Sequence, residues 1–493
     1  MAISAQCGAI ALLAGLCSAL LLCGPAQAVR YDDIPYELRR RLPEFVLRIA
    51  SPQVLSALTL ADLEEFADAY AEGRLHFVNE VRVEGSGGTL APELAKLVLQ
   101  IPEGAPYIQS RFLRIAKQAY GNGIFSTLEW EIHENADTSV DILLWYSSNN
   151  PVQIAPDIGV SGAAGFLYGV QYLDLYKDGQ DKQVGAGFQL SEEFADEPRI
   201  YGSYADNTLN RGKNGYSVSA SLGNDWRTRL KGDSRAELRA RVARIDGTYS
   251  WINRGTKFGE RLSVGTGFYT QDVDVLAGDP TGGGTVEFDQ EGEGAYVAVQ
   301  LTRSASDQLF TPKEGHSFTV RGEKHVGNFD FVSVKVDARK YIPVNNILGR
   351  KPDTAQQFGG RNNIKRFFPT ASIGLQAQAY VADGHVPYTE EIYLGSTTAL
   401  RGYRGGTAVG TKLLAARAEY RFTLDYDRER EVFVFTDHAL IGDDFSHMEA
   451  LSTVGAGALV KLPIYGGIKI GGYYGRAIDG SDSSYGIALG YQF

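Results

Sequence analysis

From residue 151 to the end of the chain, apolar residues repeatedly occupy every second position. In segments 238–242, 332–336 and 416–422, charged residues stand between the apolar ones, with Ser333 the one uncharged polar residue among them. Successive side chains of a β-strand point to opposite faces, so this period of two predicts strands with one apolar and one charged face. Clusters of Gly, Asn and Asp between the segments indicate turns. The sequence therefore predicts a large antiparallel sheet, either a soluble sandwich or a membrane barrel whose charged face lines the lumen.

Both ends of the chain favour the membrane barrel. Residues 1–28 are predicted to be a cleaved signal peptide, since residues 10–22 are mostly apolar and small residues follow at Ala26 and Ala28. All three cysteines lie in this segment, so a disulfide framework in the mature chain is excluded. At the other end, an alternating pattern runs to Tyr491 and Phe493. This end resembles the sorting signal that outer-membrane barrels present to their assembly machinery. We therefore expect that machinery to be a partner of this chain during its own insertion.

Composition supports the same localisation. Beyond residue 28 no run of about 18 apolar residues occurs, so a spanning helix is not available. Lipid leaves open sheet edges unpaired, and a chain that crosses the membrane with strands must therefore close into a barrel. The formal net charge of −11 argues against a nucleic-acid partner. We expect a bacterial outer-membrane protein in contact with lipid, with residues 29–150 in the periplasm.

The region ahead of the barrel differs in pattern. Residues 29–74 are rich in Leu, Ala, Arg and Glu, with apolar spacings close to a helical period, and are predicted to form one or two short helices. Residues 75–150 are predicted to form a strand, two helices and two strands, which makes a small α+β domain. The predicted barrel occupies residues 151–493.

The turns of the predicted barrel have uneven lengths. Segments 312–315 and 214–215 have the composition of tight turns, whereas 278–294 and 342–368 are long and polar. In barrels of this class short turns are periplasmic and long loops extracellular. We therefore expect both long segments on the extracellular side.

Two segments resemble the BamA superfamily, also called the bacterial surface antigen family. Leu400-Arg401-Gly402-Tyr403 is similar to the Arg-Gly-aromatic motif of the sixth extracellular loop, and residues 75–150 resemble a single POTRA domain. The resemblance implies a transmembrane antiparallel β-barrel of about 16 strands. The 343 residues from 151 to 493 allow about 21 per strand with its connection, which exceeds the 9–11 that spanning needs.

The resemblance also implies a lock inside the lumen. In the family the long loop folds back into the barrel, and its arginine is held by acidic residues, here Glu419 and Asp437. A guanidinium in a partly desolvated site needs carboxylate partners, and its planar fork can satisfy two. Gly402 would permit a tight turn, and Tyr403 would pack on the inner wall. The chain departs from the family after Asp437, where His438-Ala439 replace a small residue and glycine.

The resemblance implies a protein-handling barrel that inserts or translocates polypeptides. A POTRA domain can bind a client polypeptide by pairing it with a sheet edge, which gives backbone hydrogen bonds without a fixed sequence. The alternatives are a passive pore or surface antigen barrel, or the barrel part of a patatin-like secretion system that lacks the hydrolase.

Enzymatic function is not expected. No Gly-x-Ser-x-Gly nucleophile elbow occurs, and no His-Glu-x-x-His metal motif occurs either. Asp437 and His438 are neighbours on one predicted strand, so they point to opposite faces and cannot act on one substrate. We therefore expect no catalytic residues, no metal and no cofactor.

Overall fold

A sixteen-stranded antiparallel sheet makes up most of the computed structural model, and its order from β22 to β4 follows the chain. The structure describes residues 36–41, 60–72, 76–86, 99, 107–121, 125–136, 139–148, 152–161, 165–174, 182–191, 198–231, 234–253, 259–278, 291–304, 312–344, 361–395, 400–425, 430–461, 469–480 and 482–489. The strands are β4 (Val152–Ser161), β5 (Gly165–Asp174), β6 (Lys182–Ser191), β7 (Arg199–Asp206), β8 (Asn214–Lys231), β9 (Ser234–Asn253), β10 (Gly259–Gly278), β11 (Gly292–Ser304), β12 (Gly315–Gly327), β13 (Phe331–Val344), β15 (Ala371–Gly384), β18 (Lys412–Asp425), β19 (Arg430–Gly442), β20 (Glu449–Lys461), β21 (Lys469–Ala477) and β22 (Ser483–Leu489).

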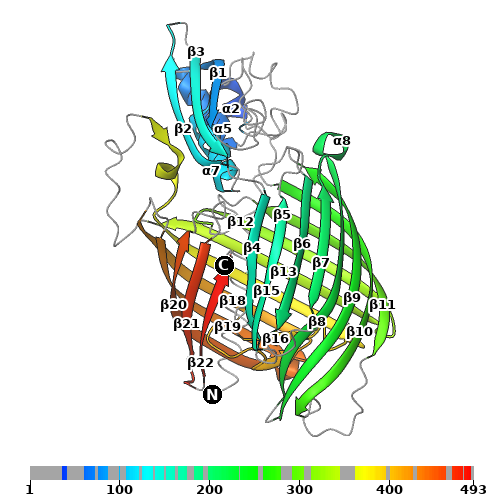
Figure 1. Ribbon diagram of the computed structural model, residues 1–493. Coiled ribbons are helices and arrows are strands. Elements are labelled where there is room, and N and C mark those ends of the chain that lie inside the picture. The colour runs from blue at the N-terminus through cyan, green and yellow to red at the C-terminus, as the bar shows by residue number, and fades with distance from the viewer. Residues whose placement is uncertain are drawn as a thin grey trace.

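The sheet curls into the shape of a barrel, and its two end strands, β4 and β22, lie beside each other (Figure 1). Among the described residues no strand pairing joins these two, so the sheet is not closed by hydrogen bonds there. The outward face carries apolar side chains that remain exposed, such as Val334 at 43% and Val434 at 51%. An apolar outer band is what a barrel presents to lipid. The large antiparallel sheet therefore agrees with the predicted barrel.

Three neighbouring strands are much longer than a bilayer requires. β8, β9 and β10 have 18, 20 and 20 residues, against the roughly 9–11 that span a membrane. At their ends farthest from the small domain, Leu238 and Ala240 are buried on the inner face, whereas Arg239 and Arg241 lie on the outer face. Arg239 pairs there with Asp274 across 2.6 Å.

The predicted orientation of segment 238–242 was therefore wrong. The period of two was right, but the charged side faces outward. The physical reason is strand length: a strand that projects beyond the apolar band meets water on its outer face, where charged side chains are favoured.

A small domain sits at one end of the barrel, which we call the domain end (Figure 1). It contains β1 (Phe77–Ser86), α7 (Gln109–Gly121), β2 (Phe125–Glu134) and β3 (Ser139–Ser148). β1 is parallel to β3, and β2 is antiparallel to β3. These strands and the second helix lie where the sequence predicted them, whereas the helix expected at 90–99 falls outside the described residues except for Leu99.

A connection from the barrel completes the sheet of the small domain. β14 (Asn362–Asn363), between β13 and β15, pairs with β2 and becomes the fourth strand in the order β1-β3-β2-β14. The 3-10 helix η3 (Ile364–Phe367) follows directly. Residues 342–344 and 361–368 therefore lie at the domain end, because β13 is the tenth strand of the sheet and even-numbered strands end beside the small domain. The sequence predicted residues 75–150 and segment 342–368 on opposite sides of the membrane, and that prediction was wrong.

The other helices are short. α2 (Tyr36–Arg41) and α5 (Leu60–Ala71) pack against each other in the N-terminal region that the sequence predicted to be helical, α8 (Leu209–Gly212) joins β7 to β8, and η4 (Phe445–His447) joins β19 to β20. No helix in the described parts of the chain is long and apolar enough to cross a membrane. The predicted signal peptide and the predicted sorting residues Tyr491 and Phe493 lie outside the described residues.

Candidate functional site

The loop between β15 and β18 starts at the far end of the barrel and turns back over its interior (Figure 1). Its described parts are residues 385–395 and 400–411, and they include the two-stranded sheet of β16 (Ile392–Leu394) and β17 (Ala408–Gly410). Apolar loop residues pack on aromatic and small side chains of the barrel strands, and those from the loop are Leu394, Leu400, Tyr403 and Ala408. The loop is therefore packed against the inner wall.

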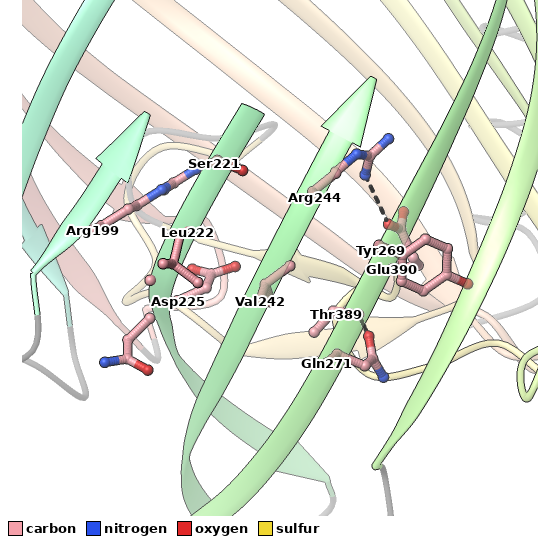
Figure 2. Close-up of a pocket in the computed structure, with 12 residues that line it drawn as sticks. Arg199, Ser221, Leu222, Asp225, Val242, Arg244, Tyr269, Gln271, Thr389 and Glu390 are labelled. Carbon is pink, nitrogen blue, oxygen red and sulfur yellow. Dashed lines mark hydrogen bonds and ion pairs between the residues drawn. The ribbon is translucent and has the colours of Figure 1, made fainter. Parts of the chain in front are cut away.

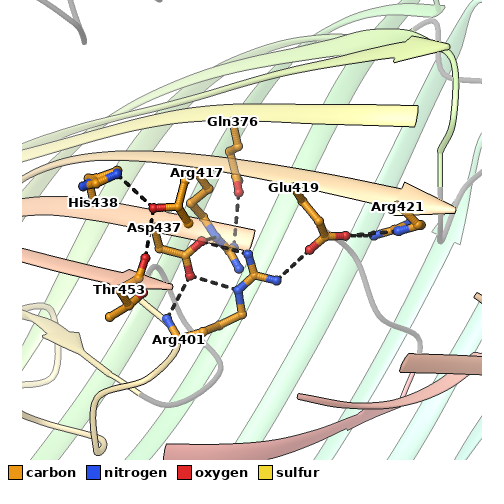
Figure 3. A network of polar contacts seen from close by, with 9 residues as sticks. Gln376, Arg401, Arg417, Glu419, Arg421, Asp437, His438 and Thr453 are labelled. Atoms are coloured by element: carbon orange, nitrogen blue, oxygen red, sulfur yellow. Dashed lines mark hydrogen bonds and ion pairs between the residues drawn. The ribbon is translucent and has the colours of Figure 1, made fainter. Parts of the chain in front are cut away.

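Arg401 makes the most specific contact of this loop. Its backbone N and its Nε both donate to Asp437 Oδ2, at 3.0 and 2.9 Å, and its Nη2 donates to Asp437 Oδ1 at 2.8 Å. Nη1 donates to Glu419 Oε2 at 2.7 Å (Figure 3). The three side chains are 1%, 0% and 2% exposed for Arg401, Asp437 and Glu419. One guanidinium thus bridges β18 and β19 with a two-pronged bond to Asp437 and a single bond to Glu419.

An aromatic ring forms the floor of this site. The guanidinium carbon of Arg401 lies 3.6 Å from the centroid of the Phe435 ring and 5.9 Å from that of Phe433. Both rings lie on β19 two residues apart, on the same face as Asp437. The attraction of a cation to a ring face grows when water is excluded, as it is here. Sequence reasoning named no role for these two aromatic residues.

Two further arginines share the carboxylates. Arg417 Nε lies 3.4 Å from Asp437 Oδ1, and Arg421 Nε donates to Glu419 Oε1 at 3.1 Å (Figure 3). Together with Arg401, three guanidinium groups therefore meet two carboxylates. All five side chains are buried. Alternation along β18 places residues 417, 419 and 421 on one face, and that spacing was visible in the sequence, although their sharing of partners was not.

Gly402 occupies a position that glycine alone fits well. Its φ of +102° is in the region that other L-residues rarely adopt. A Cβ added there would stand 3.0 Å from the backbone N of Arg476 and 3.2 Å from Cβ of Thr453. The neighbouring Tyr403 is 2% exposed and packs on the inner wall. Gly402 thus lets the chain approach the barrel wall closely enough for Arg401 to reach its partners.

A second contact holds the loop on the opposite part of the wall. Glu390 lies 3.5 Å from Arg244 Nη1 on β9, and Thr389 hydrogen-bonds to Gln271 on β10 (Figure 2). The Tyr380 hydroxyl on β15 also donates to the carbonyl oxygen of Glu390 at 2.9 Å. A cavity of about 150 Å³ lies beside these residues. Sequence reasoning missed this anchor, since nothing in the pattern indicated which charged residues of long strands would meet the loop.

The sequence also matches a model of a known family. Residues 157–493, which are 337 of the 493 residues, match the Omp85 superfamily domain. The chain belongs to the Omp85 superfamily. This confirms the resemblance that the Arg-Gly-Tyr motif indicated, since barrels such as BamA belong to it. A search among curated proteins found no match.

Solved structures show a similar fold. CdiB from Escherichia coli aligns with a TM-score of 0.54 and 13% identity over 84% of this chain and 75% of that one. CdiB from Acinetobacter baumannii aligns with a TM-score of 0.51 and 10% identity over 94% and 87%. BamA from Haemophilus ducreyi lacking POTRA domains 1–3 aligns with a TM-score of 0.49 and 14% identity over 84% of each chain. The two CdiB alignments cover more of this Omp85 chain than the 337 residues of the family match, so the similarity of fold extends ahead of residue 157.

The structure brings together the residues that the family resemblance selected inside the barrel. Arg401, Glu419 and Asp437 are in contact, whereas Tyr491 and Phe493 cannot be placed within the described residues. His438 faces away from Asp437 and bonds to Thr436 and Ser452. In the described part of this Omp85 chain, no three His, Cys, Asp or Glu residues are grouped as metal ligands.

Proposed function

We propose that this Omp85 protein handles polypeptides at the bacterial outer membrane, by inserting other barrels or exporting a partner polypeptide. In this proposal residues 75–150 are a POTRA domain in the periplasm that binds an extended client. The mixed sheet of β1, β3 and β2 beside α7 supports this assignment. A client strand added at a sheet edge gains backbone hydrogen bonds whatever its sequence, which suits a module that meets many polypeptides.

The burial of Arg401 carries the proposal. A loop attached inside the barrel at Glu419 and Asp437, and again at Arg244, occupies part of the path that a passive pore would keep open. Attachment by hydrogen bonds and ion pairs is also reversible, so the loop can rearrange when a polypeptide passes. These features favour a protein-handling barrel over a passive pore or surface antigen.

Depletion of the protein tests the proposed function. We expect that loss of the chain lowers the amounts of other outer-membrane barrels, or retains one secreted polypeptide in the periplasm. Quantitative proteomics of outer-membrane, periplasmic and medium fractions measures both. Re-expression of the wild type should restore the profile, and the Arg401→Ala variant should restore it poorly. Unchanged polypeptides together with a lower uptake of small hydrophilic solutes would instead identify a passive pore.

The predicted sorting signal gives a separate test of the outer-membrane assignment. Replacing Phe493 with serine is expected to lower assembly into the outer membrane, because the assembly machinery would lose the terminal aromatic residue, and periplasmic proteases would degrade the chain. Heat-modifiable, folded barrel in membrane fractions is the measurement. The matched control is Phe445→Ser, an aromatic side chain that is 55% exposed in the turn after β19. Equal amounts of folded barrel from Phe493→Ser and wild type would remove the sorting-signal prediction.

A further inference from the structure

One edge of the small domain is occupied by a piece of the barrel. Without β14, β2 would be the edge strand of this sheet, since the order is β1-β3-β2-β14. Asn362 and Asn363 pair antiparallel with Trp130 and Glu129. The Asn363 side chain also donates to Glu129 Oε1 at 3.0 Å. We call residues 361–368 the strap, and its backbone makes the kind of contact that an added strand from another polypeptide would make.

The strap also fills the apolar core of the small domain. Ile364 is fully buried and Phe368 is 7% exposed, and both belong to the cluster that the domain's own apolar residues form. Phe367 stacks on Trp130 with ring centroids 5.4 Å apart, and Phe368 lies 5.6 Å from Tyr120 of α7. Burying an aliphatic or aromatic side chain contributes about 1.5–3 kcal/mol. The space between β2 and α7 is therefore an apolar groove that, among the described residues, the strap helps to fill.

The outer face of the same edge recognises a positive charge. The guanidinium carbon of Arg361 lies 3.7 Å from the centroid of the Trp145 ring. Its nitrogens lie 3.9 Å from Glu129 Oε2 and 3.6 Å from Glu131 Oε1. An aromatic face beside two carboxylates of the neighbouring strand suits a guanidinium, which can stack on the ring and pair with the carboxylates at the same time. The edge thus offers a basic subsite for Arg361 and an apolar subsite that takes Ile364, three residues further along the chain, and Phe367 and Phe368, six and seven residues further along.

We propose that the strap is an internal ligand of the small domain, which occupies the β2 edge until an extended peptide displaces it. The peptide that fits has a basic residue, a short extended stretch and then aliphatic and aromatic residues, as in the strap. This inference rests on the proposed function, in which the small domain binds a client. It adds that the client site is closed by the barrel itself, so that client binding detaches the small domain from residues 361–368.

A peptide with the sequence of residues 361–368, fluorescently labelled, is the probe. The full mature chain in detergent micelles should bind it weakly, because the tethered strap competes at high effective concentration. The variant Arg361→Glu with Phe367→Ser weakens the strap at two partly exposed positions, and the apparent Kd should fall by about tenfold or more, as expected when a rarely open site becomes open. The control Arg82→Glu reverses an exposed charge on β1, the opposite edge, and should bind like the wild type.

A disulfide makes the test reversible within one polypeptide. Asn363 and Glu129 are paired residues on adjacent strands, and cysteines at such positions are close enough to bridge. In the double variant Asn363→Cys with Glu129→Cys, oxidation should abolish probe binding and reduction should restore it. Each single cysteine variant controls for the oxidant. This comparison does not depend on normal folding of the variant Arg361→Glu with Phe367→Ser, which we call the release form.

The outcomes separate the strap from the proposed function. Equal probe binding by the oxidised, reduced and release forms would overturn the strap, and so would an absence of binding to both the reduced and release forms. Binding that follows the disulfide while outer-membrane and secreted polypeptides stay unchanged in cells supports the strap and contradicts the proposed function. A natural client that cross-links equally to the oxidised and reduced forms keeps the proposed function and overturns the strap.

Discussion

Replacing Arg401 with alanine is expected to release the β15–β18 loop from the inner wall while the barrel stays folded. The change removes the side-chain bonds to Asp437 and Glu419, and breaking a buried pair of this kind costs about 3 kcal/mol. The two carboxylates keep Arg417 and Arg421 as partners, so the remaining charges balance and the barrel itself loses little. The loss of stability therefore falls on the loop.

Accessibility of a cysteine at Ala408 measures this release. Ala408 lies on β17 and is 4% exposed, so Ala408→Cys should react slowly with an impermeant maleimide added outside the cell. In the Arg401→Ala background we expect labelling to be faster by about tenfold or more, because local opening controls access to a buried thiol. Arg401→Lys should resemble alanine, since an ammonium cannot reproduce the two-pronged bond.

The matched control for labelling is Arg404→Cys. The Arg404 side chain is 80% exposed in the same loop, so a cysteine there should react quickly in both backgrounds. Fast labelling of Ala408→Cys with Arg401 intact would mean that the loop is already open, and the proposed function would lose its main support at the level of residues.

The contacts of Arg401 were partly predictable from the sequence. Alternation places Glu419 and Asp437 on the charged face of neighbouring strands, and the family resemblance indicated that Arg401 is the arginine they bind. The register was not predictable: Arg417 is paired with Asp437 and Glu419 with Phe435 across β18 and β19. A period of two specifies faces, but the offset between strands depends on turns and on packing across the whole sheet. The sharing of carboxylates and the aromatic floor both follow from that offset.

Two further features of the fold could not be predicted from the alternating pattern: the direction in which segment 238–242 faces, and the end of the barrel at which segment 342–368 begins and ends. Alternation at 238–242 does not say which face is outside, and the answer depends on how far β9 projects beyond the apolar band. The position of segment 342–368 depends on strand parity, since the tenth strand returns to the domain end whatever the length of the connection. The number of strands before a connection determines the end of the barrel at which the connection lies, whereas its length does not. Counting strands in this way requires that every strand be recognised in the sequence.

Asp437→Asn is expected to destabilise the folded barrel more than Glu419→Gln. Among the described contacts, Asp437 accepts three hydrogen bonds from Arg401 and also lies beside Arg417, whereas Glu419 accepts one from Arg401. Without the Asp437 charge, Glu419 is the one carboxylate left in this described cluster for three buried guanidinium groups, and removing one partner of a buried ion pair costs about 3–5 kcal/mol. The midpoint of heat-induced unfolding, followed by the mobility shift of the barrel in gels, should fall furthest for this variant.

Replacing Arg401 with alanine in the Asp437→Asn variant should restore part of the lost thermal stability. In Asp437→Asn with Arg401→Ala, the cluster keeps two guanidinium groups, those of Arg417 and Arg421, and one carboxylate, that of Glu419, so the excess charge is smaller and the midpoint should lie above that of Asp437→Asn alone. Such coupling is the signature of a direct interaction in a double-mutant cycle. The control is Asp272→Asn, which breaks a half-exposed pair with Arg241 outside the barrel and should change little. If the effects of Arg401→Ala and Asp437→Asn simply add, the two residues do not hold each other, and the attachment of the loop must rest on its apolar packing and on Glu390.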